Sequence, residues 1–201
     1  MLKTSLALGL LGSIAASTVG VDLSQLTSVS SLQCVHDYGY DFVIARVYCS
    51  SGYPDSNGPS NINNAWSAGM SHHDAHLAAT NGTTVGGALG ATIGMIWLDI
   101  EGTQYWSSST SNNINFLQSM VDEGHARGVS MGVYSSSSQW SPIMGGTTQF
   151  SNLPLWYAHW DYTFSPCTSD FKSFGGWSTP AMKQYAGDEG FCSANYDKNC
   201  Y

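Results

Sequence analysis

Short apolar runs, separated by segments rich in Gly, Ser and Asn, recur along this chain and predict alternating strands and helices. Strands are predicted where β-branched and aromatic residues gather, and helices where apolar residues recur every three or four positions. The predicted strands cover residues 21–24, 41–48, 70–78, 93–99, 129–135, 155–160, 181–186 and 194–197. The predicted helices cover residues 26–36, 61–68 and 112–127, and the last third of the chain offers no convincing helix.

This order of elements predicts an α/β fold. Strand, helix and strand in repetition imply parallel strands joined by right-handed crossovers, and about eight strands favour a closed barrel over an open sheet. Removal of 20 residues as a leader would leave 181 of the 201, fewer than the roughly 250 of a full β/α barrel. We therefore expect an irregular TIM-like β/α barrel with a helix-poor C-terminal third.

The segment 93–102 combines a buried strand with two acids. Its first six residues are almost wholly apolar, and Asp99 and Glu101 follow with only Ile100 between them. Side chains two apart on a strand point the same way, so both carboxylates are predicted to share one face. Like charges that close cannot both ionise freely, which suits a site needing one acid and one carboxylate. The alternative is a solvated loop just past the strand.

The N-terminus has the layout of a secretory signal. Lys3 precedes an apolar run over residues 6–16, and small residues follow, with cleavage expected between Ala16 and Val21. The predicted organisation is a signal peptide over residues 1–20 and a single domain over 21–201. Since the remaining sequence has no stretch that could span a bilayer, we expect a secreted or vesicular protein.

Five cysteines fit an oxidising compartment, and their odd number leaves at least one out of any intramolecular pairing. They are Cys34, Cys49, Cys167, Cys192 and Cys200. Cys192 and Cys200 could close a short loop, although sequence alone does not fix the pairing. None has the spacing of a zinc site, so structural roles are favoured. Asn81-Gly82-Thr83 matches the N-glycosylation pattern.

The charge balance excludes some partners. Without Lys3 the chain has five basic and 14 acidic residues, a formal net charge of −9. This argues against nucleic acid and against anionic membranes, which attract Lys and Arg. Protonation of carboxylates would lower the self-repulsion of such a chain, so we expect it to work in acid, in a secretory or phagosomal vesicle or a gut lumen.

Several segments, in order along the chain, resemble glycoside hydrolase family 25, the Ch-type lysozymes. They are Val21-Asp22-Leu23-Ser24, Asp41-Phe42-Val43-Ile44-Ala45-Arg46, Ala65-Trp66-Ser67-Ala68-Gly69-Met70, Trp97-Leu98-Asp99-Ile100-Glu101, Met131-Gly132-Val133-Tyr134, Leu155-Trp156-Tyr157-Ala158-His159 and Tyr196-Asp197-Lys198-Asn199. The resemblance implies an irregular barrel that hydrolyses the β-1,4 bond between N-acetylmuramic acid and N-acetylglucosamine in peptidoglycan.

The resemblance also implies catalytic roles. Glu101 matches the general acid, which protonates the leaving oxygen. Asp99 matches the partner carboxylate, which orients the N-acetyl group of the substrate or stabilises positive charge at the anomeric carbon. Asp22 matches the acid of the first strand and Asp197 that of the last, with Asp188 as a competitor. Attack by the substrate's own acetamido oxygen, favoured on family grounds, and displacement by water both remain open.

Sugar binding needs flat apolar faces beside hydrogen-bonding groups. The residues predicted to line the cleft are Tyr134, Trp156, Trp160 and Gln184, all near strand ends. For any one aromatic, core filling is the commoner role. His125 and His159 are interpreted as structural.

The third strand departs from the family pattern. Relatives tend to carry an aromatic near position 76 and then Pro and Cys, whereas this chain reads His76-Leu77-Ala78-Ala79-Thr80, without either. His72, Asp74 and His76 alternate there and could bind zinc or iron. Along a strand, however, they would spread over about 13 Å, which is awkward for one ion.

Three hypotheses follow. The favoured one is a monomeric, cofactor-free N-acetylmuramidase that acts on bacterial peptidoglycan in antibacterial defence or digestion. A peptidoglycan-binding protein that has lost catalysis is the second, motivated by the altered third strand. A His/Asp metallohydrolase is the third and least favoured.

Overall fold

A computed structural model describes residues 17–70, 72–78 and 94–201, with the backbone alone over 72–78. The glycosylation pattern at Asn81 and most of the predicted signal peptide lie outside these residues, as do the side chains of His72, Asp74 and His76. Within the described part, no helix has both the length and the apolar character needed to cross a bilayer.

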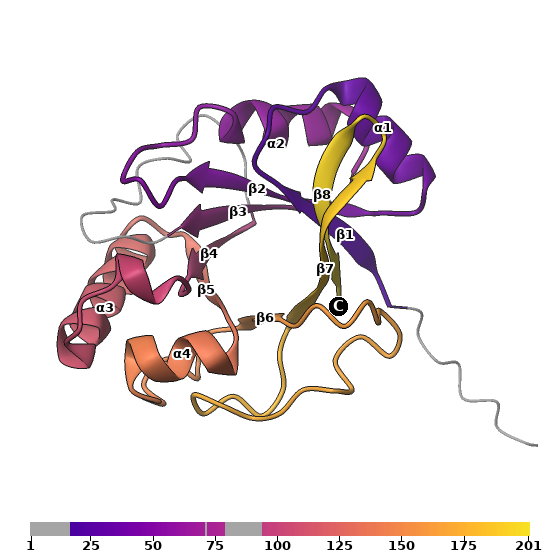
Figure 1. Cartoon of the computed structure of the whole chain (residues 1–201). Helices are drawn as coiled ribbons and strands as arrows, with labels where there is room; N and C mark the ends of the chain where they lie inside the picture. Colours follow the sequence, from indigo (N-terminus) through magenta and orange to yellow (C-terminus); the bar gives the residue numbers. More distant parts are fainter. Residues whose placement is uncertain (1–16, 71, 79–93) are drawn as a thin grey trace, which may run out of the picture.

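Eight strands close into a barrel in chain order, as predicted (Figure 1). They are β1 (Val19–Leu23), β2 (Phe42–Tyr48), β3 (His72–Ala78), β4 (Met95–Asp99), β5 (Ser130–Ser135), β6 (Leu155–Ala158), β7 (Met182–Phe191) and β8 (Ala194–Cys200). Neighbours from β1 to β7 are parallel. β8 returns as a hairpin and is antiparallel to both β7 and β1, so the prediction of parallel strands is wrong for this last strand.

Helices cover the outside of the first five strands (Figure 1). They are α1 (Val29–Asp37), α2 (Gly58–Ser67), α3 (Thr110–Ala126) and α4 (Ser137–Met144), with a 3-10 turn, η2 (Thr103–Tyr105), before α3. Ser28 and Ser109 cap α1 and α3, each accepting a hydrogen bond from a backbone N–H of the first turn. α4 was not predicted, because it is eight residues long, begins with serines and contains Pro142.

The strands have two apolar faces, and β4 illustrates them. Ile96 and Leu98 face outward into the main core, which the helices complete. Trp97 faces the barrel interior and packs there with Tyr134 and Trp156. Because both faces are covered, the strand reads as one continuous apolar run in the sequence.

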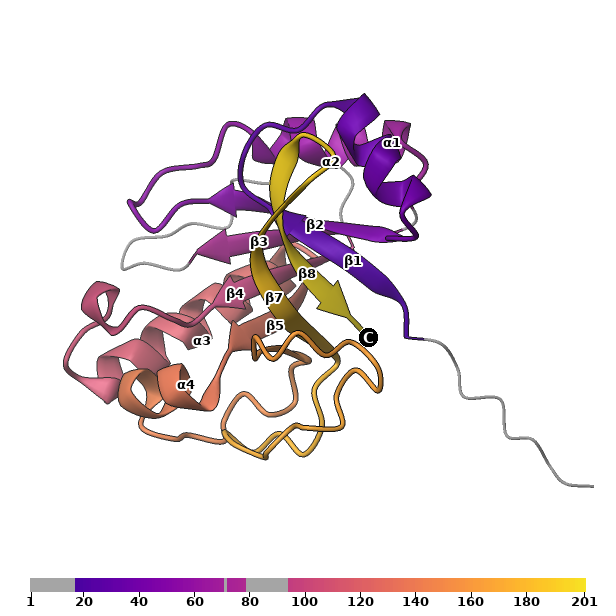
Figure 2. The same cartoon turned by 45° about the vertical axis from the view of Figure 1, so that its right-hand side comes forward.

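The C-terminal third is built differently. Beyond β6 the chain runs through residues 159–181 without a helix and then forms the β7–β8 hairpin, which crosses in front of the other strands in Figure 2. Disulfides join Cys34 to Cys192 and Cys167 to Cys200, and Cys49 is the odd thiol. The suggested Cys192–Cys200 pair is wrong, because Cys192 lies in the turn before β8 and bonds Cys34, whereas Cys200 ends β8 and bonds Cys167.

β1 begins two residues before the predicted start. Val19 and Gly20 pair with Cys200 and Asn199 of β8. Thr18 also exchanges two backbone hydrogen bonds with Tyr201, each of 3.0 Å. A cut after Gly20 would therefore remove the first positions of β1, whereas a cut nearer Ala16 would keep them.

Candidate active site

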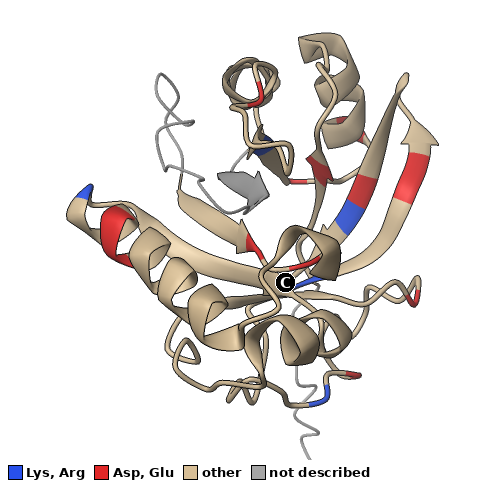
Figure 3. Ribbon diagram, turned by 60° about the vertical axis from the view of Figure 1, so that its left-hand side comes forward, with Lys and Arg blue, Asp and Glu red and all other residues tan. Residues whose placement is uncertain are grey.

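The acids singled out in the sequence meet at one end of the barrel. Asp22 lies near the end of β1, Asp99 ends β4, and Glu101 follows two residues later. Asp197 lies inside β8, but antiparallel pairing sets it directly opposite Asp22. Asp197 thus lies at this end of the barrel because it pairs with Asp22, although it does not lie at the end of its own strand. Figure 3 shows the acidic residues of the ribbon in red and the few Lys and Arg in blue.

Asp99 and Glu101 share a side of the chain, as the alternation predicted. Ile100 between them is fully buried in the outer core, and its N–H donates to the carbonyl of Tyr134 over 2.9 Å, which extends the ladder past β4. Asp99 is buried at 7% exposure, whereas Glu101 is exposed. One carboxyl is thus held inside the mouth of the barrel and the other faces solvent.

Four of the acids lie close enough to Tyr134 for their charges to affect the pKa of its phenol. Burial raises the pKa of its phenol well above the usual value, and the negative charges of four carboxylates raise it further. In descending order of effect these belong to Glu101, Asp99, Asp22 and Asp197. The phenol therefore stays protonated at any working pH and serves as a hydrogen-bond donor.

Gln184 connects the acids to the aromatics. It is 2% exposed, and its Nε2 donates to Asp22 over 2.9 Å and to Asp197 over 3.3 Å. Its Oε1 accepts from Tyr134 Oη at 2.8 Å and from Trp160 Nε1 at 2.7 Å. Since an indole N–H can only donate, the orientation of the amide is fixed. Substrate binding by Gln184 stays a prediction, and in the structure its amide nitrogen holds two carboxylates.

Asn199 is a site residue to which the sequence assigned no role. Its Nδ2 donates to Asp22 over 2.8 Å, and its Oδ1 accepts from Trp156 Nε1 at 2.9 Å. Asn199 lies two positions after Asp197 on β8, and this spacing is the signal that could have found it. Trp156 is fully buried, with its ring 4.5 Å from that of Tyr134, so it fills the barrel interior.

Two cavities open at this end of the barrel. One, of about 410 Å³, is lined by Glu101, Tyr134, Trp160 and the start of α4. The other, of about 310 Å³, is lined by Asp22, Asp197, Arg46 and Asp188. The Asp188 N–H donates to Asp197 over 2.8 Å, so this competitor for the role supports Asp197 through its backbone.

Trp160 presents a flat face to the cavity beside Glu101. Its ring lies directly on Gly187, where any side chain would collide with the indole. The other face is open to solvent, and Trp160 as a whole is 51% exposed. Its indole N–H donates a hydrogen bond to Gln184. A rigid aromatic with one face covered and one face open is suited to stacking on a sugar ring.

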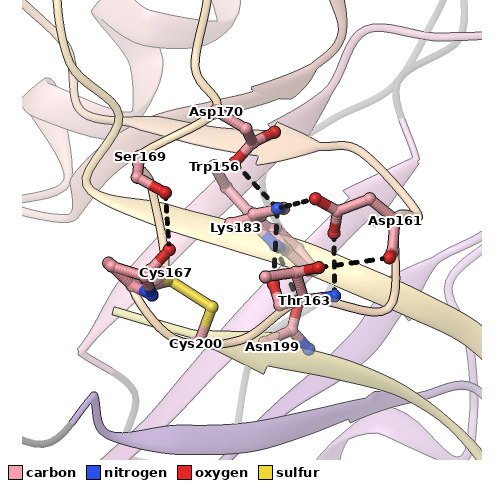
Figure 4. Close-up of a disulfide and its surroundings, with 10 residues drawn as sticks. Trp156, Asp161, Thr163, Cys167, Ser169, Asp170, Lys183, Asn199 and Cys200 are labelled. Atoms are coloured by element: carbon pink, nitrogen blue, oxygen red, sulfur yellow. Dashed lines mark hydrogen bonds and ion pairs between the residues drawn. A yellow bond between two sulfur atoms is a disulfide. The ribbon is translucent and has the colours of Figure 1, made fainter.

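His159 lines the same cavity and belongs to a charged cluster (Figure 4 shows its other members). Its Nδ1 bonds Asp170, while Lys183 Nζ lies 2.8 Å from both Asp161 and Asp170 and is fully buried. Burial would raise the pKa of each carboxyl, but hydrogen bonds from Lys183 lower the pKa of both below the usual value.

Of the described residues, only His159, Asp161 and Asp170 gather groups close enough for one metal ion, within 4.8 Å. The Lys183 ammonium already pairs with both carboxylates, so the trio fits an ion-pair cluster better than a metal centre. His125 is exposed on α3, away from the four acids at the end of the barrel.

Comparison with known proteins gives a consistent picture. A family model described as "Lysozyme-like protein 1" matches residues 13–185. The chain is 45% identical to "Probable GH family 25 lysozyme 2" of Dictyostelium discoideum over 90% of each chain. It is 31% identical to "Lysozyme-like protein 5" of Caenorhabditis elegans over 92% of each.

Solved structures share the fold. A family GH25 lysozyme from Aspergillus fumigatus superposes with a TM-score of 0.73 at 18% identity, covering 92% of this chain and 94% of the other. A muramidase from Acremonium alcalophilum gives 0.70 at 22% identity, with 90% and 92% covered.

Proposed function

This chain belongs to glycoside hydrolase family 25, the lysozyme family of glycosidases, and we propose that it cleaves the β-1,4 bond between N-acetylmuramic acid and N-acetylglucosamine in bacterial peptidoglycan. The observation that carries the proposal is the convergence of Glu101, Asp99, Asp22 and Asp197 on Tyr134 beside open cavities. Retention of all four acids favours a working enzyme over a protein that only binds the cell wall.

Glu101 is the proposed general acid. It is exposed and lines the 410 Å³ cavity, where its carboxyl can reach a glycosidic oxygen. Asp22 accepts amide hydrogen bonds from both Gln184 and Asn199, which favour its ionised form. A general acid needs its proton before the bond breaks, and a carboxylate beside Glu101 would favour that protonated form.

Asp99 is the proposed partner. Held inside the mouth on the same side of the chain as Glu101, it can accept the N–H of a substrate acetamido group and turn the acetamido oxygen toward the anomeric carbon. That oxygen would attack as Glu101 gives its proton to the leaving oxygen, and water would then open the cyclic intermediate with Glu101 as base. Asp22 and Asp197 would balance positive charge that develops in the transition state.

Trp160 is the proposed stacking platform for a sugar ring, and Tyr134 would support it through their shared acceptor on Gln184. No cofactor is needed for this chemistry. We further propose a secreted monomer, released from its signal peptide and active in acidic vesicles or a lumen, in defence or digestion. The two disulfides fit an oxidising compartment.

Glu101→Gln tests the proposal, with Glu123→Gln on the surface of α3 as the matched control. We expect the release of reducing ends from purified peptidoglycan to fall at least about 100-fold in Glu101→Gln, because the proton donor is lost, and to stay unchanged in the control. Equal activity of Glu101→Gln and the wild type would refute the assignment. Binding to peptidoglycan without any release by the wild type would instead favour the non-catalytic alternative.

A further inference from the structure

A third cavity, of about 300 Å³, lies where the chain passes from β4 through η2 to α3 (Figure 1). Tyr105, Trp106, Phe116 and the amide side chains of Asn112 and Asn115 line it. Tyr105, Asn112 and Asn115 are exposed, and the volume lies at the lower end of the roughly 300–1,000 Å³ of small-molecule sites. An aromatic face beside primary amides is the chemistry that recognises sugars.

Tyr105 is mounted in the same way as Trp160. The Tyr105 ring lies on Gly102, where an added Cβ would come within 2.7 Å of Tyr105 Cδ2, and Tyr105 is 50% exposed. Trp160 lies on Gly187 and is 51% exposed. Both aromatics thus pack beside a glycine and stay about half exposed, Tyr105 through the Cδ2–Cε2 edge of its ring, and of the two only Trp160 lines the cavity of Glu101.

The third cavity is tied to the residues around Glu101. Trp106 Nε1 donates to the Glu101 carbonyl over 3.0 Å, and Tyr105 rests on the next residue, Gly102. Trp106 in turn packs edge-on against Phe116 of α3, with 6.1 Å between the ring centroids. A ligand held here would therefore lie at the same barrel end as the reacting bond without occupying the cavity in front of Glu101.

We propose that this cavity is a second carbohydrate site, which binds a neutral stretch of peptidoglycan glycan outside the catalytic cleft. Tyr105 stacks on a sugar ring, and Asn112 and Asn115 bond its hydroxyl or acetamido groups. The site holds the enzyme on the insoluble polymer while the catalytic cavity acts on a nearby bond. This inference rests on the proposed function, because peptidoglycan is the substrate that the family implies.

Binding is measured with the Glu101→Gln variant, so that the wall is not degraded during the experiment. Adding Tyr105→Ala is expected to weaken binding to purified peptidoglycan sacculi about 5-fold, whereas Tyr105→Phe keeps the ring and the affinity. Adding Tyr38→Ala is the control, because Tyr38 is 72% exposed after α1, at the opposite end of the barrel. Unchanged sacculus binding in Tyr105→Ala would overturn the proposal.

Comparing activity on soluble and insoluble substrates distinguishes this site from the catalytic cleft. In the otherwise unaltered enzyme, Tyr105→Ala is expected to keep kcat/KM on a short soluble tetrasaccharide within about twofold while losing activity on sacculi. An equal loss on both substrates would assign Tyr105 to the catalytic cleft and overturn the second site. A wild type that hydrolyses neither substrate would refute the proposed function, while the sacculus-binding comparison would still test the site.

Discussion

The first two thirds of the barrel and its last third hold their strands in different ways. From β1 to β5 the outer face is covered by helices, and the main core consists of side chains such as Ile96, Leu98 and Trp140. The loop over residues 159–181 covers the outside of the last third instead. There Lys183 is fully buried against Asp161 and Asp170, and Cys167 is bonded to Cys200 (Figure 4).

The difference shows that crosslinks and ion pairs can replace a helix as the cover of a barrel. The loop still packs Phe171, Phe174 and Trp177 against the main core, so the crosslink and the ion pairs act beside apolar burial. Both regions supply the site: Asp99 and Glu101 come from the helix-covered part, and Gln184, Asp197 and Asn199 from the crosslinked part. Weakening the last third should therefore disturb the hydrogen bonds to Asp22 as well as the fold.

The largest effect on stability is expected when the disulfide between Cys167 and Cys200 is removed. Replacing Cys167 and Cys200 together by Ser should lower the free energy of unfolding by about 4 kcal/mol, because the bridge closes a loop over a sequence separation of 33. Denaturant unfolding of the oxidised proteins measures this. Cys49→Ser, which removes the odd thiol, is the control and should change little. A loss below about 1 kcal/mol would mean that the loop is held by other contacts.

A smaller loss of stability is expected when the buried ammonium of Lys183 is removed. Lys183→Met should lower the free energy of unfolding at pH 7 by about 3 kcal/mol, since Asp161 and Asp170 lose their partner yet remain about a quarter exposed. Lys198→Met, on the neighbouring strand with an exposed partner in Glu189, is the control and should cost under about 1 kcal/mol.

This loss should depend on pH with a defined sign. Lys183 holds the pKa of both carboxyls below their ordinary value of 3.8, so its contribution is present above that pH. The contribution is lost as the pH falls through the lowered pKa values. The stabilities of the wild type and Lys183→Met should therefore converge in strong acid, and a constant difference down to pH 2 would contradict this origin.

The smallest effect is expected in the helix-covered part. Ser109→Ala should cost about 1 kcal/mol, because the hydroxyl accepts a hydrogen bond from Asn112 N at the start of α3. Ser119→Ala, in the middle of the same helix, is the control. Thermal unfolding measures both, and an effect of Ser109→Ala as large as that of Lys183→Met would contradict the view that apolar packing dominates here.

Local patterns were enough to predict much of the fold. The apolar run before Asp99 predicted β4, and the three- and four-residue spacing predicted α3. The pairing of Asp22 with Asp197 was not predictable from local pattern, because it depends on the register of an antiparallel strand 175 positions away. The same holds for Gln184, whose partners come from four other segments.

The predictions that differ from the structure also have physical causes. Cys192 and Cys200 are close in sequence, but Cys192 lies in the turn before β8 and Cys200 ends this extended strand. α4 was missed because it is only eight residues long and contains Pro142, although Trp140, Ile143 and Met144 follow a helical spacing. Trp156 and Trp160 look alike in the sequence, yet one is fully buried and the other half-exposed, because β6 ends at Ala158 between them.

The proposed muramidase activity is tested most directly by the sugar that carries the new reducing end. Purified peptidoglycan is digested with the wild type, the new reducing ends are reduced with borohydride, and the fragments are analysed by mass spectrometry. We expect reduced N-acetylmuramic acid at these ends, absent from a digest with Glu101→Gln. Reduced N-acetylglucosamine in its place, or no new reducing ends with the wild type, would contradict it.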